Sequence, residues 1–391
     1  MRAGTMVLAA LLMGCGGDRP TTLTPPTVVD SAGVRVVTNR IPSPGLPDYA
    51  DVALEYDLEI TGGPQGPFAD VERAVTLPDG RIVVANRSTY QVRYFAADGT
   101  FLQAVGDQGY GFGSFQDLSR IGRAGGDSVW VFDVRAERLT MFDGQGEAVQ
   151  DAVAPAHQFV AGRFGDGSYL LVPGWRTDFH ANDPSDELRR DPAVYYRWSP
   201  ASGDTVPVGT FRHNELLVLE PDEADGLVVG TPPFGRQTVR AVGPGRFYVG
   251  EQDRFEIRGF DPDGTLREIV RVDGVDLTLT PEVVAAARRS TRADEDETPW
   301  AERFWAAMPS SRPAYGTLMI DALGHLWVSE HVANLTPARN WMVFSPDGTM
   351  LGLVQVPPNL RILEIGADHV LGATEGLPGT EVIRRYALTR R

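Results

Sequence analysis

Residues 68–105 begin Phe68-Ala-Asp-Val-Glu-Arg-Ala-Val-Thr-Leu-Pro-Asp-Gly80 and continue Arg81-Ile-Val-Val-Ala85, Gln91-Val-Arg-Tyr-Phe95, Asp98-Gly99 and Thr100-Phe-Leu-Gln-Ala-Val105. Four short runs rich in β-branched and aromatic residues alternate here with turn residues. Asp-Gly pairs close the first and the third connections, as in tight β-hairpins. The segment therefore predicts four antiparallel strands in one small sheet.

The same unit returns along the rest of the chain. Its second strand recurs at residues 128–132, 168–172, 246–250 and 325–329, and its last hairpin recurs at residues 141–144, 197–203, 259–264 and 343–348. First strands start near Val71, Asp117, Gln158, Arg236, Tyr315 and Leu360. Six repeats of a four-stranded unit predict an all-β fold, a six-bladed β-propeller that spans residues 30–391.

The last unit, Leu360–Leu388, has room for only three strands. We expect residues 53–60, which precede the first unit, to supply the missing outer strand. A ring closed by strands from both ends of the chain hides two edges that would otherwise promote aggregation.

Two inserts interrupt the repeat, and a third irregular stretch at residues 219–235 is expected to be a loop. One insert covers residues 174–191, between the second and third strands of the third unit. The other covers residues 280–313, between the fourth and fifth units, and is expected to be helical because Thr280 can cap a helix that begins at Pro281. A second short helix there carries Trp305, which we expect to lie across the loop face as a lid and to form a wall of a binding pocket with Trp175, Glu330 and His331. The alternative is that its aromatic face only packs the insert onto the propeller.

The N-terminus has the pattern of an export signal. Arg2 is followed by a short apolar run, Met6–Met13, which is too short to span a bilayer as a mature helix. Leu12-Met13-Gly14-Cys15 resembles a bacterial lipobox and contains the only Cys of the chain, so residues 1–15 are interpreted as a lipoprotein signal peptide ending at Cys15. The alternative is a plain secretory signal with an accidental Cys. Residues 16–29 are then a flexible tether.

The amino-acid composition argues against several classes of function. The net charge of −16 argues against nucleic-acid binding, because phosphates select a basic surface. The chain has no lysine, which excludes a Schiff-base lysine and a P-loop lysine. A single Cys excludes an internal disulfide and any zinc or iron–sulfur site built on several cysteines.

Residues 68–115 resemble the NHL-type propeller repeat, including the connector Gly106-Asp-Gln-Gly-Tyr-Gly-Phe-Gly-Ser-Phe115. The lipobox, the segment Asp30-Ser-Ala-Gly-Val-Arg-Val-Val37 and the six units together are similar to six-bladed propeller lipoproteins of Gram-negative bacteria. This resemblance implies a lipid-anchored protein of the cell envelope, in the outer membrane and facing either the periplasm or the cell surface. It says little about function, because propellers host many unrelated activities.

Polar and aromatic side chains that follow the second strands, together with one from the helical insert, are the candidate binding residues. Such loops open on one face of a propeller, around its axis. The candidates are Asn86, Asp133, Trp175, Glu251, Glu330, His331 and Trp305. The competing interpretation is that the acidic members only tie neighbouring loops together.

No catalytic constellation stands out, so no residue is predicted to be catalytic or to bind a metal, and no cofactor is predicted. The sequence favours a non-catalytic binding or scaffold protein that holds a peptide, glycan or protein partner on its loop face. The alternative is a metal-assisted hydrolase or lyase, lactonase-like or propeller-lyase-like, with Glu251, Glu330 and His331 in the central funnel. Calcium is the metal that this alternative implies, because it prefers oxygen ligands.

Overall fold

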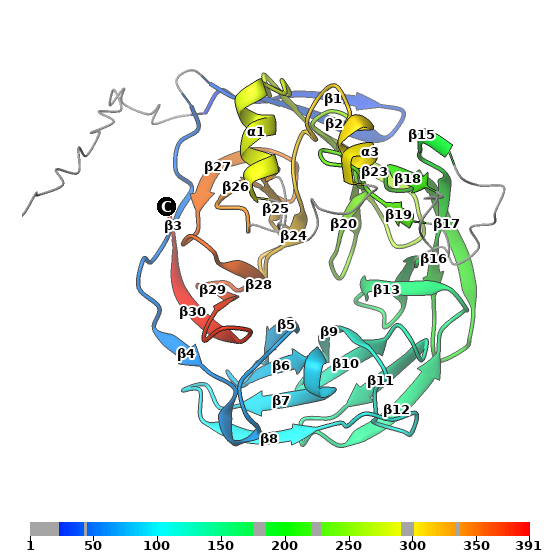
Figure 1. The fold of residues 1–391 in the computed structure, drawn as a ribbon, viewed down its shortest axis with the longest axis vertical. Helices are drawn as coiled ribbons and strands as arrows, with labels where there is room; N and C mark the ends of the chain where they lie inside the picture. The colour runs from blue at the N-terminus through cyan, green and yellow to red at the C-terminus, as the bar shows by residue number, and fades with distance from the viewer. Residues whose placement is uncertain (1–22, 43–44, 175–184, 220–227, 291–300, 333–336) are drawn as a thin grey trace, which may run out of the picture.

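The fold is a β-propeller in a computed structural model that describes residues 23–42, 45–174, 185–219, 228–290, 301–332 and 337–391. Within these ranges, six sheets of four or more strands surround a common axis, and one three-stranded sheet lies beside them (Figure 1). The all-β prediction is confirmed. Among the same residues, no helix is both long enough and apolar enough to cross a membrane.

The first two sheets follow the repeat pattern. Sheet 1 contains β5 (Val71–Thr76), β6 (Ile82–Asn86), β7 (Gln91–Phe95) and β8 (Phe101–Val105), flanked by the short 3-10 helices η1 (Gly63–Gln65) and η2 (Arg87–Thr89). Sheet 2 contains β9 (Leu118–Gly125), β10 (Ser128–Asp133), β11 (Arg138–Phe142) and β12 (Ala148–Val153). Neighbouring strands are antiparallel, because each pair is joined by a tight turn.

Sheets 3 and 4 carry the additions to the repeat. Sheet 3 contains β13 (Gln158–Arg163), β14 (Tyr169–Pro173), β16 (Pro192–Trp198) and β17 (Thr205–Arg212). Sheet 4 contains β20 (Val239–Val242), β21 (Phe247–Gly250), β22 (Glu256–Phe260) and β23 (Leu266–Asp273). Between them, β15 (Ser185–Arg189), β18 (Leu216–Leu219) and β19 (Val228–Gly230) form the three-stranded sheet. The prediction that residues 219–235 are only loop was wrong, because β19 pairs with β18.

Sheets 5 and 6 complete the ring. Sheet 5 contains β24 (Leu318–Ile320), β25 (Leu326–Ser329), β26 (Asn340–Phe344) and β27 (Met350–Gln355). Sheet 6 contains β28 (Arg361–Ile365), β29 (His369–Glu375) and β30 (Glu381–Arg390).

Segments from the N-terminal end add strands to two distant sheets. The outer edge of β30 pairs with β3 (Ala50–Val52) and with β4 (Leu58–Ile60). The expected strand at residues 53–60 therefore needs its bounds corrected, since residues 53–57 carry no strand. β1 (Thr27–Ser31) and β2 (Val34–Arg40) form a hairpin, and β2 runs parallel to β23 on sheet 4. Residues 27–29 thus belong to a strand, and the expected boundary of the tether at residue 29 lies too far along the chain.

Apolar side chains fill each junction between neighbouring sheets. One cluster of buried residues lies between each successive pair from sheet 1 to sheet 6. A further cluster joins sheet 6 back to sheet 1 and contains Leu58 and Ile60 from β4. The core of the molecule is therefore a ring of inter-sheet layers, and the first strand of each sheet faces the axis.

The helical insert connects sheet 4 to sheet 5. It contains α1 (Pro281–Ser290) and α3 (Ala301–Ala306), which lie on the side of the ring that holds β20–β27 (Figure 1). Thr280 caps α1, since its hydroxyl oxygen accepts a hydrogen bond from the Val283 N–H at 3.3 Å. The start of this helix lies where the Thr-Pro pair predicted it.

Candidate functional site

Asn86 and Asp133 lie at the ends of β6 and β10 and are buried. The Asn86 side-chain carbonyl oxygen accepts a hydrogen bond from the Ala69 N–H at 3.0 Å. The Asp133 carboxylate accepts hydrogen bonds from the N–H groups of Gln116, Arg135 and Ala136. Both side chains hold the loops of their own sheets, because buried backbone N–H groups need acceptors.

Glu330 and Glu251 occupy the corresponding places after β25 and β21. Glu330 accepts hydrogen bonds from the Arg339 N–H and from the N–H and side-chain amide of Asn340, at 2.8–3.2 Å. Glu251 accepts a hydrogen bond from the Arg212 N–H and forms an ion pair with Arg258 at 3.0 Å. Neither carboxylate is free to act as a general base without losing these contacts.

Trp305 and His331 both lie near Phe234, beside the helical insert. Trp305 is 6% exposed and packs with Phe234 and Ala287, while the Arg288 guanidinium lies 4.5 Å from its ring centre. The His331 ring lies 5.9 Å from the Phe234 ring. Burial, together with the charge of Arg312, lowers the pKa of His331 to about 4, so this imidazole is neutral at pH 7.

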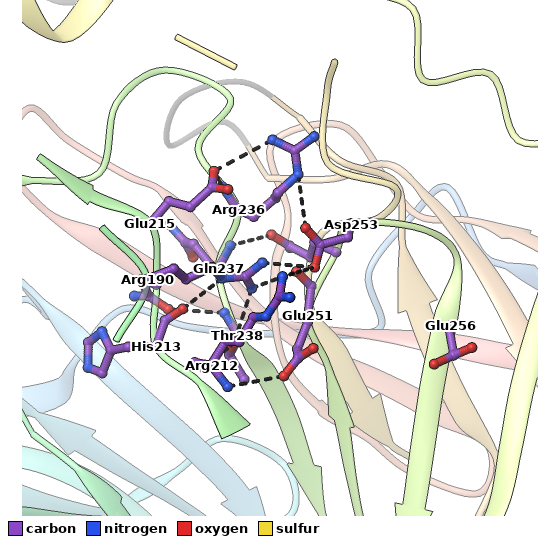
Figure 2. Close-up of polar contacts among 12 residues, drawn as sticks. Arg190, Arg212, His213, Glu215, Arg236, Gln237, Thr238, Glu251, Asp253 and Glu256 are labelled. Carbon is purple, nitrogen blue, oxygen red and sulfur yellow. Dashed lines mark hydrogen bonds and ion pairs between the residues drawn. The ribbon is translucent and has the colours of Figure 1, made fainter. Parts of the chain in front are cut away.

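The loop face between sheets 3 and 4 carries a network of arginines and carboxylates (Figure 2). Asp253 lies within ion-pair distance of Arg190 (2.9 Å), Arg236 (3.5 Å) and Arg212 (3.6 Å). Arg190 also donates to the carbonyl oxygens of His213 and Glu251. Arg190 belongs to the insert at residues 174–191, so this network attaches the insert to sheet 4.

A cavity of about 630 Å³ lies on the axis and is lined from all six sheets. This volume falls within the range of small-molecule sites, roughly 300–1,000 Å³. Six arginines contribute to its wall: Arg73, Arg120, Arg123, Arg163, Arg240 and Arg361. Three acidic residues do so as well: Asp321, Glu330 and Glu364. The wall is therefore richer in cations than in anions, although the whole chain carries a net charge of −16.

The electrostatics of this wall are dominated by half-buried cations. Burial, together with the nearby charges of Arg73 and Arg240, lowers the pKa of Arg120 to about 9 against an opposing effect of Glu72. Burial also lowers the pKa of Arg73. Arg73 of sheet 1 and Arg240 of sheet 4 therefore both lie close enough to Arg120 of sheet 2 to repel its charge.

The residues that the structure describes do not fit the calcium site of the alternative hypothesis. No group of three or more His, Cys, Asp or Glu side chains is placed to hold a metal ion in the described ranges. Glu251, Glu330 and His331 are held by separate partners, as described above. This arrangement of donors therefore does not support a chemical step through calcium.

Of the seven predicted binding residues, Glu330 alone lines the cavity among those that the structure describes. Trp175 and Cys15 lie outside the described residues. The expected pocket wall needs correction, because no described residue of 280–313 lines the cavity and Trp305 instead packs against Ala287 of the insert and Phe234 outside it. Sequence reasoning missed the axial arginines, although an arginine near the start of three inner strands was a signal that could have found them: Val71-Glu-Arg73, Leu118-Ser-Arg120 and Thr238-Val-Arg240.

No protein-family model matches the sequence, and no curated protein matches it. Among solved structures, similar folds occur in a Bacteroides fragilis protein named as an exported protein (9% identity, TM-score 0.52, covering 91% of this chain and 99% of that one) and in a member of the DUF4221 family from Bacteroides vulgatus (10% identity, TM-score 0.51, covering 88% and 99%). A gluconolactonase from Xanthomonas campestris aligns over 95% of this chain and 96% of its own, with 15% identity and a TM-score of 0.43. At these identities the likeness concerns the fold alone.

Proposed function

We propose that this chain is an exported, lipid-anchored β-propeller of the cell envelope that binds a peptide, glycan or protein partner without catalysis. The partner is held where the loop face meets the central cavity. One observation carries the proposal: the carboxylates of Asp133, Glu251 and Glu330 on the loop face are occupied by backbone N–H groups and an arginine, whereas a cavity lined from six sheets lies on the axis. Small ligands bind in concave sites of this kind.

The signal-like N-terminus supports the location. A protein with a similar fold is named as exported, which agrees with this interpretation of residues 1–15. Two or three acyl chains on Cys15 would anchor the chain stably, since each buried methylene contributes about 0.8 kcal/mol.

The anchor is tested by Cys15→Ser. We expect this variant to leave the membrane pellet and to appear in the soluble fraction, because it cannot be lipidated. Fractionation in high salt and immunoblotting measure the change, with wild type as the reference. Retention of the variant in the membrane pellet at high salt would overturn the anchor and the outer-membrane location with it.

Ligand binding at the cavity is tested with a variant whose larger side chain blocks the cavity. Thr317 lines the cavity and is exposed, so Thr317→Trp fills the cavity without disturbing the core. Thr265→Trp is the matched control, on an exposed turn of sheet 4 away from the cavity. Peptides, oligosaccharides and envelope proteins that bind the wild type should bind Thr265→Trp equally and Thr317→Trp at least tenfold more weakly. Equal binding by both variants would contradict a site at the cavity.

Catalysis is tested separately with lactone substrates in the presence of calcium. We expect no turnover above the uncatalysed rate. Turnover that disappears in both Glu330→Gln and Glu251→Gln would favour the hydrolase alternative over the binding function.

A further inference from the structure

The arginines that line the axial cavity differ in how many hydrogen bonds and ion pairs their guanidinium groups make within the protein. Arg361 donates to the Val71 carbonyl oxygen and to Glu381, each at 2.7 Å. Arg123 lies 3.8 Å from Glu364 and is largely exposed. Arg361 is therefore held by hydrogen bonds within the fold, whereas Arg123 has one long ion-pair contact and is open to solvent.

Arg73, Arg120 and Arg240 are half-buried and much less occupied. The Arg73 side chain makes no hydrogen bond with any residue that the structure describes, although the charges of Glu364 and Glu72 act on it. Arg120 has an ion-pair contact with Glu72 at 3.8 Å, which is too long for a hydrogen bond, and it lies over the Phe159 ring. Arg240 donates to the carbonyl oxygen of Thr238 at 3.3 Å and also interacts with the Tyr195 hydroxyl.

The acidic residues of the wall do not neutralise this group. Asp321 accepts hydrogen bonds from the Trp327 indole and from Arg390. Glu364 accepts a hydrogen bond from the Thr76 N–H at 2.7 Å. Glu330 caps the loop at Asn340. Glu72 and Glu364 lie close enough to act on the charge of Arg73, and Glu72 on that of Arg120, but no carboxylate of the described residues accepts a hydrogen bond from these three guanidiniums.

We propose that Arg73, Arg120 and Arg240 bind an oxyanion, the carboxylate, phosphate or sulfate group of a small ligand, inside the central cavity. A guanidinium presents five N–H donors in a planar fork that matches two oxygens of such a group. Three guanidiniums, from β5, β9 and β20, supply positive charge to this site, and a neutral ligand cannot compensate that charge. The depressed pKa of Arg120 supports this assignment, because a bound anion would relieve the repulsion among the three cations. The inference rests on the proposed binding function of the cavity and names the chemistry of its ligand.

The test titrates the full chain with sodium phosphate, sodium sulfate and sodium succinate at constant ionic strength, set with sodium chloride. Calorimetry and thermal melting are the readouts, and glycerol is the neutral probe. We expect an oxyanion to bind and to raise the melting temperature beyond chloride. Binding of phosphate alone indicates a free inorganic ion, and binding of succinate indicates an organic acid.

Three single variants locate the site: Arg73→Met, Arg120→Met and Arg240→Met should each weaken oxyanion binding at least tenfold. Arg267→Met is the matched control, since Arg267 is exposed and pairs with Asp261 outside the cavity. Without oxyanion, Arg120→Met should melt no lower than wild type, because it removes a repelled charge, and this separates lost binding from misfolding. Unchanged binding in all three variants, or no oxyanion binding by wild type, would overturn the inference. The proposed function survives that result if Thr317→Trp still blocks another ligand, and it fails too if nothing binds at the cavity.

Discussion

Single polar side chains at the ends of second strands act as acceptors for backbone N–H groups in this ring. Asp133 serves three such groups and Glu330 serves two, together with one side-chain amide. A buried N–H without a partner costs about 1–3 kcal/mol, so these carboxylates stabilise the loop face before any ligand is considered. The proposed binding function therefore has to rely on groups that the loops do not need, and the axial arginines are such groups.

Two histidines should give the stability of the protein opposite dependences on pH. His331 has a pKa lowered to about 4, so between pH 4 and 6.5 the native state binds fewer protons than the unfolded state. Its stabilisation is present above pH 6.5 and is lost as the pH falls toward 4. The nearby carboxylates of Glu364 and Asp368 raise the pKa of His369, so its stabilisation is present below pH 6.5 and is lost as the pH rises through the raised value.

Urea unfolding at pH 5, 7 and 8 measures both effects. From pH 7 to 5, His331→Gln should lose about 2 kcal/mol less free energy of unfolding than wild type, from the linkage of protonation to folding. His369→Gln should lose less than wild type between pH 7 and 8. Parallel pH profiles for both variants and wild type would show that the surroundings assigned to these rings are wrong.

For single residues, the sequence predicted where the polar side chains of the loop face lie, but not which groups they contact. Asn86, Asp133, Glu251 and Glu330 all follow second strands, as the repeat predicts. Their partners lie elsewhere, as when the Glu251 carboxylate meets the N–H of Arg212 on another sheet. A pattern in one repeat does not contain this information, and so the capping role could be offered only as an alternative.

The sequence predicted strands correctly where the pattern that defines them lies within a short stretch of the chain. The Asp-Gly turns and apolar runs fix the four strands of sheet 1 nearly to the residue. The hairpin β1–β2 was missed because its partner, β23, lies more than 200 residues along the chain. A short exposed strand has no pattern of its own, and it forms because a long-range edge is available.

The helical insert is held together by its own small core. Trp305→Ala should lower the free energy of unfolding by about 3–5 kcal/mol, as deletion of a buried aromatic ring does. The same variant should bind ligands in the cavity as wild type does, because Trp305 does not line it. Urea unfolding and hydrogen exchange in α1 are the measurements. Tyr110→Ala is the control, since Tyr110 is 70% exposed and should change stability by less than about 0.5 kcal/mol.

A loss of ligand binding in Trp305→Ala without a loss of stability would mean that the ring faces a ligand after all. In that case the insert would act as a lid, as its aromatic residues suggested from the sequence.

At the scale of the molecule, closure of the ring depends on both ends of the chain. β30 has β29 on one side and the N-terminal strands β3 and β4 on the other. The cluster between sheets 6 and 1 draws on β4 as well as on Phe68 and Leu363. The repeat predicted that the last unit lacks an outer strand, but the division of that strand into two pieces follows from the path of residues 53–57, which no periodicity marks.

The double variant Leu58→Asp/Ile60→Asp should break the pairing of β4 with β30 that closes the ring. Both side chains are buried, at 8% and 3% exposure, and a carboxylate cannot enter that layer without losing its hydration. The outer edge of β30 would then present unpaired N–H and C=O groups, which template pairing with other chains. We expect a lower melting temperature and aggregation, measured by light scattering and size-exclusion chromatography. Leu54→Asp is the matched control in the same segment, because Leu54 is 84% exposed and should leave the protein monomeric. A double variant that stays monomeric with an unchanged melting curve would show that β4 does not close the ring.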